Sequence, residues 1–262
     1  MPQPALLVVV ALLGLAVGSF LNVVIYRVPR DESLSHPRSH CPACGQPVRN
    51  RHNIPVLSWL LLRGRCADCK TPISARYPLV EAGTAVLFVA VAARFGLSWE
   101  LPAYLYLAAI SVALAAIDLD VMRLPDKIVL PSYAVALALM APAVIAEHTW
   151  SAAGRALLAA AVLYVGYSLL SAMPRGMGGG DLKLSPLIGF YLGWLGWSSV
   201  LIGAFSAFLF GGIVGAALML TRRATRKTRI PFGPYMLAGA FLAVFAGAPI
   251  AQWYSSLLVP TV

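Results

Sequence analysis

Charged residues are scarce in this sequence. Only 11% of its 262 residues are charged, whereas 60% are hydrophobic, and the mean hydropathy is +0.79. Soluble domains carry about a quarter charged residues, so the composition excludes an ordinary soluble domain. Apolar runs near the ~20 residues that cross a ~30 Å hydrocarbon core recur along the chain. The sequence therefore predicts an all-α polytopic membrane protein.

Acidic residues are scarcer still, with 10 Asp and Glu against 20 Lys and Arg, which gives a net charge of +10. The basic residues concentrate in residues 27–76 and 222–229. Such clustering is typical of the cytoplasmic side of a membrane protein. Nucleic acid is not favoured as a partner, because the basic loops lack interleaved aromatic side chains. Membrane lipid is the expected neighbour of these loops.

Hydropathy predicts eight transmembrane spans, of which the sixth is short and glycine-rich: 5–26, 79–97, 101–119, 128–146, 153–173, 184–196, 198–220 and 234–258. The N-terminus lacks a basic segment before its first apolar run, so that run is expected to stay in the membrane as the first span. The predicted organisation is a first span (1–27), a cytoplasmic loop domain (28–78) and a seven-span membrane domain (79–262).

Orientation follows from the basic residues. If residues 27–78 are cytoplasmic, alternation places 119–127, 174–183 and 221–233 on the same side, which then holds 18 of the 20 Lys and Arg. The exceptions are Arg94 and Arg155. This asymmetry predicts a multi-pass protein with both termini outside.

Cysteine is limited to four residues, arranged as two C-x-x-C pairs separated by 21 residues. Thiols on the cytoplasmic side stay reduced, which favours a metal over disulfides. Four thiolates suit a closed tetrahedral zinc site. We therefore expect one structural Zn²⁺ in the cysteine loop, with a redox role or free thiols as less favoured alternatives; its ligands are Cys41, Cys44, Cys66 and Cys69.

Several aspartates lie at the predicted cytoplasmic ends of transmembrane spans. Asp118 directly follows an apolar stretch, and acidic groups in such places are functional candidates. Asp120 is about 200° further around a helix and must face elsewhere. Asp126 follows Pro125 and precedes an apolar span, so we expect it to be a helix N-cap.

A second acidic segment is the run Gly178–Gly180 followed by Asp181. The glycines allow sharp bending and close approach of another backbone. Topology places Asp181 at the same membrane face as Asp118, although an N-cap role for Asp181 is equally compatible with the sequence. Two carboxyls meeting in a cleft could share a proton and hydrolyse a peptide bond.

Several segments together resemble the prepilin peptidases, also called type IV leader peptidases: Gly18–Arg27 (GSFLNVVIYR), Trp59–Cys69, Tyr77–Glu81, Ile117–Pro131 and Gly176–Leu184. The resemblance implies an eight-span GxGD-type aspartyl protease of the bacterial inner membrane, with its active site facing the cytoplasm. It implies Asp118 and Asp181 as the catalytic pair, although many members have a bulkier residue where this chain has Gly179.

The resemblance also implies the substrates and a co-substrate. Members cut the leaders of prepilins or pseudopilins for a type IV pilus or type II secretion system. Many then methylate the new N-terminus with S-adenosyl-L-methionine. Substrate contacts are expected near the cleft, at Glu81, Asp120, Asp126, Gly178, Gly179, Gly180 and Lys183.

Two further residues lie at helix positions where polar groups need partners. Glu81, at the inner end of the second span, is either paired with an Arg or a site for the substrate amine. Asn22 is expected to form a hydrogen bond between helices. Rival functions are an ion- or proton-coupled transporter that uses the intramembrane aspartates, and a membrane scaffold that binds partners through the cysteine loop.

Overall fold

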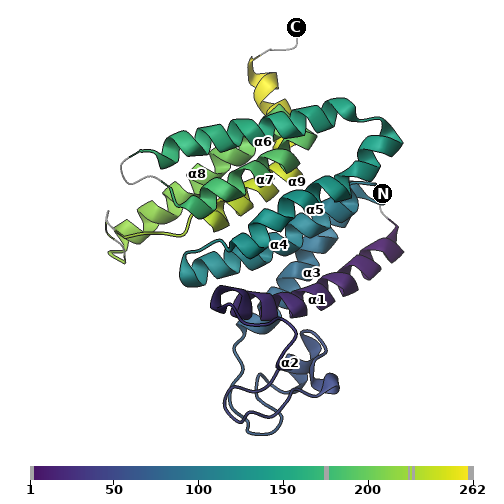
Figure 1. Cartoon of the computed structure of the whole chain (residues 1–262), viewed down its shortest axis with the longest axis vertical. Helices are drawn as coiled ribbons and strands as arrows, with labels where there is room; N and C mark the ends of the chain where they lie inside the picture. Colours follow the sequence, from purple (N-terminus) through teal and green to yellow (C-terminus); the bar gives the residue numbers. More distant parts are fainter. Residues whose placement is uncertain (1–2, 174–176, 224, 226–227, 259–262) are drawn as a thin grey trace. The chain divides into compact units, whose positions relative to one another are not determined.

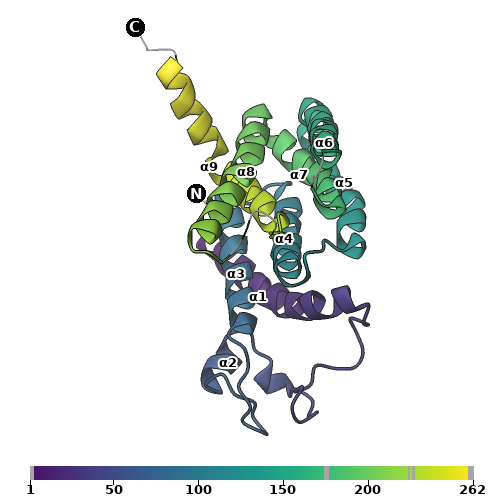
Figure 2. The same cartoon turned by 90° about the vertical axis from the view of Figure 1, so that its left-hand side faces the viewer.

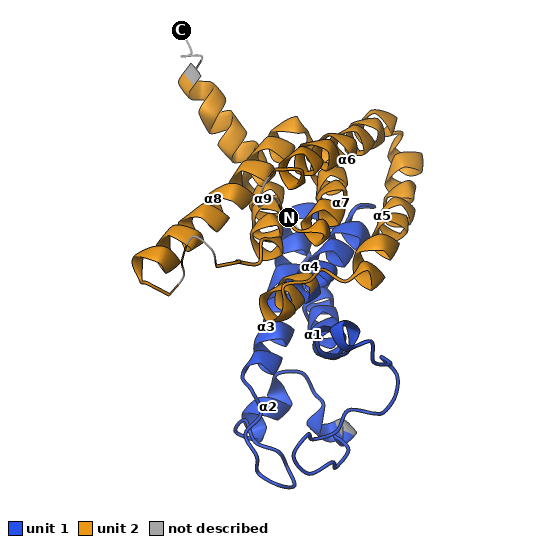
Figure 3. Cartoon of the chain, turned by 60° about the vertical axis from the view of Figure 1, so that its left-hand side comes forward, with its two compact units in different colours: residues 1–113 blue, residues 114–262 orange. Residues whose placement is uncertain are grey.

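The computed structural model describes residues 3–173, 177–223, 225 and 228–258. The chain divides into two compact units, residues 1–113 and 114–262 (Figure 3). The described residues form helices joined by loops, and their only β-type pairings are two isolated bridges in the cysteine loop. The predicted all-α fold is confirmed. The observed division falls inside a helix, and the predicted three-part organisation remains a prediction.

Eight long helices correspond one to one with the eight predicted spans (Figure 1): α1 (Pro4–Arg27), α3 (Arg76–Phe95), α4 (Leu101–Val121), α5 (Asp126–Glu147), α6 (Trp150–Ser171), α7 (Gly179–Leu195), α8 (Trp197–Leu220) and α9 (Gly233–Leu258). The cysteine loop contains only short helices: η1 (Val28–Arg30), η2 (Asn50–His52) and α2 (Leu57–Leu61). Among the described residues, seven helices are long and apolar enough to cross a membrane. The exception is α7, the predicted short span, with 17 residues.

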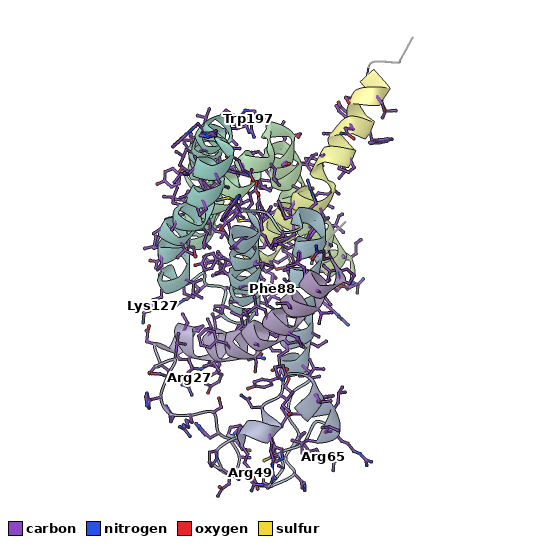
Figure 4. All side chains as sticks on the ribbon, turned by 90° about the vertical axis from the view of Figure 1, so that its right-hand side faces the viewer. Arg27, Arg49, Arg65, Phe88, Lys127 and Trp197 are labelled. Atoms are coloured by element: carbon purple, nitrogen blue, oxygen red, sulfur yellow. The ribbon has the colours of Figure 1, made fainter. Side chains whose placement is uncertain are left out.

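Glycine allows α1 and α3 to pack closely in the first unit. A Cβ on Gly14 would lie 2.6 Å from the Cα of Ala85, and a Cβ on Gly18 would lie 2.7 Å from the Cα of Glu81. Gly14 and Gly18 form a G-x-x-x-G pattern, which lets two helix backbones approach in a membrane. Phe88 fills the remaining space and is 3% exposed (Figure 4). The Asn22 amide donates to the carbonyl of Tyr77, at 3.2 Å, which confirms the predicted hydrogen bond between helices.

In the second unit, glycines allow the same close packing in two helix pairs, α6 with α7 and α8 with α9 (Figure 2). A Cβ on Gly193 would lie 2.5 Å from the Cβ of Ala159, so α6 and α7 touch through small residues. A Cβ on Gly239 would lie 2.6 Å from the carbonyl oxygen of Gly203. Arg155 closes one end of the first pair, because its guanidinium donates to the last carbonyls of α7 at 2.7 and 2.8 Å. Tight pairing leaves the opposite helix ends to form the candidate site.

Candidate active site and metal centre

Asp118 lies in the last turn of α4 and is 5% exposed. Its Oδ2 accepts a hydrogen bond from the backbone N–H of Gly233, at 3.0 Å, although 115 positions separate the two residues. Gly233 is the first residue of α9, so the carboxyl meets a helix N-terminus, where backbone N–H groups favour negative charge. The Asp118 side chain, at the end of α4, therefore binds the N-terminus of α9.

Asp181 lies in the first turn of α7 and is half-buried. Its Oδ2 would lie 3.4 Å from a Cβ placed on Gly178, so the carboxyl turns back toward the residue before the helix. It is also close enough to Asp118 to interact with it electrostatically. The N-cap position belongs to Gly178, which is extended with φ −67° and ψ 149°. Asp181 is instead the third residue of the helix, and its carboxyl lies near Gly178. The alternative prediction of Asp181 as the N-cap residue is wrong.

Leu124 packs between the segments that carry the two aspartates and is 8% exposed. A Cβ on Gly180 would lie 3.0 Å from the Cβ of Leu124. A Cβ on Gly233 would lie 3.2 Å from Leu124 Cδ2 and 2.8 Å from Asp118 Oδ2. The end of α4 and the starts of α7 and α9 therefore meet at one end of the second unit, as the predicted topology requires.

This arrangement can perform acid–base chemistry. Two nearby carboxyls readily hold one proton between them, so that one accepts a proton while the other donates one. Asp120, on the same helix as Asp118, is exposed rather than directed into this site. Its position agrees with the predicted offset around the helix.

Asp126 and Lys183 form an ion pair beside the aspartates. Lys183 Nζ donates to both carboxylate oxygens of Asp126, at 2.7 and 2.8 Å. The hydroxyl of Tyr133 donates to the backbone carbonyl of Lys183. Asp126 is the first residue of α5, the N-cap is Pro125, and no side chain caps this helix. The predicted N-cap role of Asp126 is therefore wrong, because its carboxylate bonds to Lys183 instead of to its own helix.

Glu81 belongs to the first unit and is 9% exposed. Its Oε2 accepts a hydrogen bond from the backbone N–H of Val56, at 2.7 Å. Val56 has φ +61°, an unusual conformation for a β-branched residue. Glu81 thus holds the turn before α2, a contact that neither predicted alternative named.

The cysteine loop brings its four sulfurs within 4.8 Å of one another. Cys41 Sγ and Cys69 Sγ are 3.8 Å apart, which equals the ~3.8 Å edge of a zinc–thiolate tetrahedron with ~2.3 Å bonds. Hydrogen bonding to Thr71 lowers the pKa of the Cys69 thiol to about 6, which favours the thiolate that a metal needs. The donor set and spacing fit Zn²⁺.

Both halves of this loop have the same backbone pattern. The N–H of Cys41 donates to the carbonyl of Gln46 at 2.9 Å, and the N–H of Cys66 donates to that of Thr71 at 2.8 Å. Gly45 and Lys70 hold equivalent positions with φ +71° and +62°. Arg49 pairs with Asp68 at 2.7 Å and so links the two halves of the loop.

Sequence reasoning missed Gly233, Leu124 and Tyr167. The Gly233–Pro234 pair is a recognisable helix start, since Pro favours the first turn, but nothing local indicates contact with Asp118. Tyr167, 4% exposed, interacts electrostatically with Asp181 from near the C-terminal end of an apolar helix. Its aromatic character there is also compatible with ordinary packing.

Comparisons with known proteins cover most of the chain. Residues 12–95 match the Bacterial Peptidase A24 N-terminal domain, and residues 105–220 match the Type IV leader peptidase family. A prepilin leader peptidase/N-methyltransferase of Aeromonas hydrophila is 40% identical over 94% of this chain and 92% of its own length. A protein of the same name from Pseudomonas aeruginosa is 35% identical over 93% and 91%. No solved structure matches the chain.

Proposed function

Since the chain belongs to the type IV leader peptidase family, we propose that it is a membrane aspartyl endopeptidase that removes leader peptides from type IV prepilins or pseudopilins. The observation that supports the proposal is that Leu124 contacts both the start of α7, which carries Asp181, and the start of α9, whose Gly233 binds Asp118. The chain is a multi-pass membrane protein, as its apolar helices require.

The proposed reaction uses the two carboxyls as a pair. The ionised carboxyl removes a proton from water, whose oxygen attacks the scissile carbonyl carbon, while the neutral carboxyl protonates the carbonyl oxygen. The tetrahedral intermediate then collapses, the C–N bond breaks and the new amine receives a proton. Gly178 and Gly179 are exposed, and among the described residues beyond its chain neighbours no atom lies within 4 Å of a Cβ placed on Gly179. This open backbone suits the approach of an extended substrate strand.

Charged groups near the pair are proposed to contact the basic substrate leader. Asp120 and Asp126 are exposed, and Asp126 keeps acceptor capacity beyond its pairing with Lys183. Gly180 is proposed to fix the loop against Leu124 rather than to open it. Glu81, in the first unit, is also proposed to contact the substrate, because its carboxylate keeps acceptor capacity beyond the bond from the Val56 N–H to Oε2.

Zn²⁺ is proposed as a structural ion held by Cys41, Cys44, Cys66 and Cys69. A closed set of four thiolates leaves no position for water or substrate, so the ion would stabilise the loop without entering the hydrolysis. The geometry of the sulfurs supports this assignment.

Methyl transfer to the new N-terminus is proposed because the relatives are named for both activities. S-adenosyl-L-methionine would supply the methyl group. The described residues contain no strand–turn–helix unit of the dinucleotide-binding kind, and we assign no residues to the methyl donor.

The active site is proposed to face the cytoplasm of the bacterial inner membrane. Placing the basic loops inside puts 18 of 20 Lys and Arg on that side. Among these, Arg175, Arg226 and Lys227 lie outside the described residues. Single cysteines introduced beside Asp118 and Asp181 should be labelled from the cytoplasm, and those at Arg94 and Arg155 from outside. Labelling of the two aspartate segments from opposite sides would contradict this orientation.

The direct test is incubation of the purified, detergent-solubilised protein with a prepilin, followed by mass spectrometry of both fragments. We expect a new N-terminus at the leader boundary, and a further methyl group when S-adenosyl-L-methionine is present. A transporter or a scaffold would leave the prepilin intact.

A further inference from the structure

We propose that Gly233 is a positioning residue for Asp118, so that the first turn of α9 is a third component of the active site beside the two aspartate segments. The inference rests on the proposed function of Asp118. Gly233 lies outside both matched family ranges, which end at residue 220. It concerns how the carboxyl is held, whereas the proposed function concerns what the carboxyl does.

The first argument is the hydrogen bond. The N–H of Gly233 is a helix-terminal donor with no partner inside α9, because the first N–H groups of a helix have no carbonyl to meet. It donates to Asp118 Oδ2 at 3.0 Å in a buried setting. One carboxylate oxygen is thereby fixed by backbone, and the other remains for substrate or water.

The second argument is steric. A Cβ on Gly233 would lie 2.8 Å from Asp118 Oδ2, and real Cβ atoms do not approach other atoms so closely. The carboxylate is the mobile partner in this contact, so any side chain at position 233 would displace it. Leu124 Cδ2, 3.2 Å from the same Cβ, blocks the alternative in which the new side chain moves aside. Only glycine allows the carboxyl to occupy its observed position.

The third argument is the anchoring of the segment before Gly233. The Phe232 ring lies 5.2 Å from that of Phe208, which lies 5.9 Å from that of Tyr167. Tyr167 interacts electrostatically with Asp181. An aromatic series therefore extends from the residue preceding Gly233 to the surroundings of the second aspartate. The start of α9 is held by packing and does not depend on Asp118 for its position.

A purely structural role for Gly233 would give a different result from a positioning role. A packing defect lowers the melting temperature and disturbs binding and turnover together. A displaced carboxyl lowers turnover alone, because the substrate-binding surface and the fold are intact. A misplacement of about 1 Å can cost roughly 100-fold in rate.

The experiment compares Gly233→Ala with Gly212→Ala and Asp118→Asn in the full-length protein, measuring kcat, KM and melting temperature with a prepilin. Gly212 is the matched control, because it is an exposed helical glycine with no atom within 4 Å of an added Cβ. We expect Gly233→Ala to lower kcat about 100-fold with KM and melting temperature unchanged. Gly212→Ala should behave as the original protein does.

A second variant separates the hydrogen bond from the added bulk and remains informative if Gly233→Ala fails to fold. Replacing the amide at Gly233 by an ester, through incorporation of glycolic acid, removes the donor without adding an atom. We expect kcat to fall about ten-fold, the effect of losing one hydrogen bond to a charged group. Unchanged kcat in Gly233→Ala and in the ester, with Asp118→Asn inactive, would overturn the positioning role alone. An active Asp118→Asn would overturn the proposed function and the inference together.

Discussion

The cysteine loop and the aspartate site are built in opposite ways. In the loop, each half forms its backbone hydrogen bonds within about six residues: the N–H of each first cysteine donates to a carbonyl five positions later. At the aspartate site, the N–H that binds Asp118 comes from 115 positions away. Local chain geometry arranges the sulfurs, whereas tertiary packing of α4, α7 and α9 arranges the carboxyls.

The difference predicts where each site is vulnerable. A site assembled by tertiary packing depends on small residues at helix contacts, since they set the approach of separate elements. A site assembled from local turns depends on the turns and on the ion that joins them. Substitutions in the two regions should therefore have unlike effects on turnover, metal content and stability.

The largest effect is expected at the carboxyls. Asp118→Asn and Asp181→Asn should each abolish prepilin cleavage, because a neutral amide cannot take up or release the proton that hydrolysis requires. Asp120→Asn is the comparison on the same helix: Asp120 is exposed and is proposed only to contact the substrate leader, so this variant should keep its kcat and at most raise KM. The measurement is cleavage by purified variants of verified melting temperature. Substantial cleavage by either of the first two variants would exclude the pair as the catalytic machinery.

Removal of one sulfur should act on the metal first. Cys66→Ser is expected to reduce zinc from near one equivalent to a small fraction, because it removes one of the four converging sulfurs and leaves the tetrahedral set incomplete. Cleavage should fall indirectly as the loop loses its structure. Elemental analysis and limited proteolysis of the loop measure both effects.

Ala67→Ser, between the two cysteines of the same pair, is the control that adds a hydroxyl without removing a ligand. A metal-free protein that keeps the proteolysis resistance and activity of the original would contradict a structural zinc. A full zinc equivalent in Cys66→Ser would contradict the four-cysteine set.

The contrast between local turns in the cysteine loop and tertiary packing at the aspartate site also explains how much of each region the sequence predicts. The candidate metal ligands of the cysteine loop were predictable because C-x-x-C spacing places two sulfurs on one tight turn. The four sulfurs do converge in the structure. The helices were predictable because apolar run length determines them. The candidates Asp118 and Asp181 were predictable as isolated acids at a membrane edge.

The contacts between distant segments were not predictable from one sequence. Gly233 resembles any glycine at a helix start, and Leu124 resembles any apolar residue in a short turn. The position of Asp126 after Pro125 is typical of a capping residue. In the structure its carboxylate instead forms an ion pair with Lys183, which belongs to another helix. The local sequence pattern failed here because a charge-assisted hydrogen bond to a distant lysine is stronger than one to a backbone N–H of the same helix.

A smaller effect is expected from that ion pair. The side chains of Lys183 and Asp126 are 44% and 52% exposed, and such pairs contribute about 0.2–1 kcal/mol. A double-mutant cycle with Asp126→Asn and Lys183→Gln should therefore give a coupling in kcat of less than about five-fold. Because Asp126 is also proposed to contact the substrate leader, Asp126→Asn should raise KM both with Lys183 and with Gln at position 183. An unchanged KM would contradict that contact, and a coupling far above five-fold would contradict the weak ion pair.

The smallest effect is expected inside the cysteine loop, at an equivalent position that is glycine in one half and lysine in the other. Gly45 has φ +71° and Lys70 has φ +62°, a region that disfavours side chains by about 1–2 kcal/mol. No atom lies within 4 Å of a Cβ on Gly45, so Gly45→Lys meets only this backbone cost. It should weaken zinc retention about five-fold in chelator competition, as about 1 kcal/mol requires. Lys70→Gly should change retention little, because relief of the backbone cost is offset by about 0.4–1 kcal/mol of added freedom in the unfolded loop. Equal weakening by both substitutions would show that the two halves are not equivalent and that Lys70 acts through its side chain.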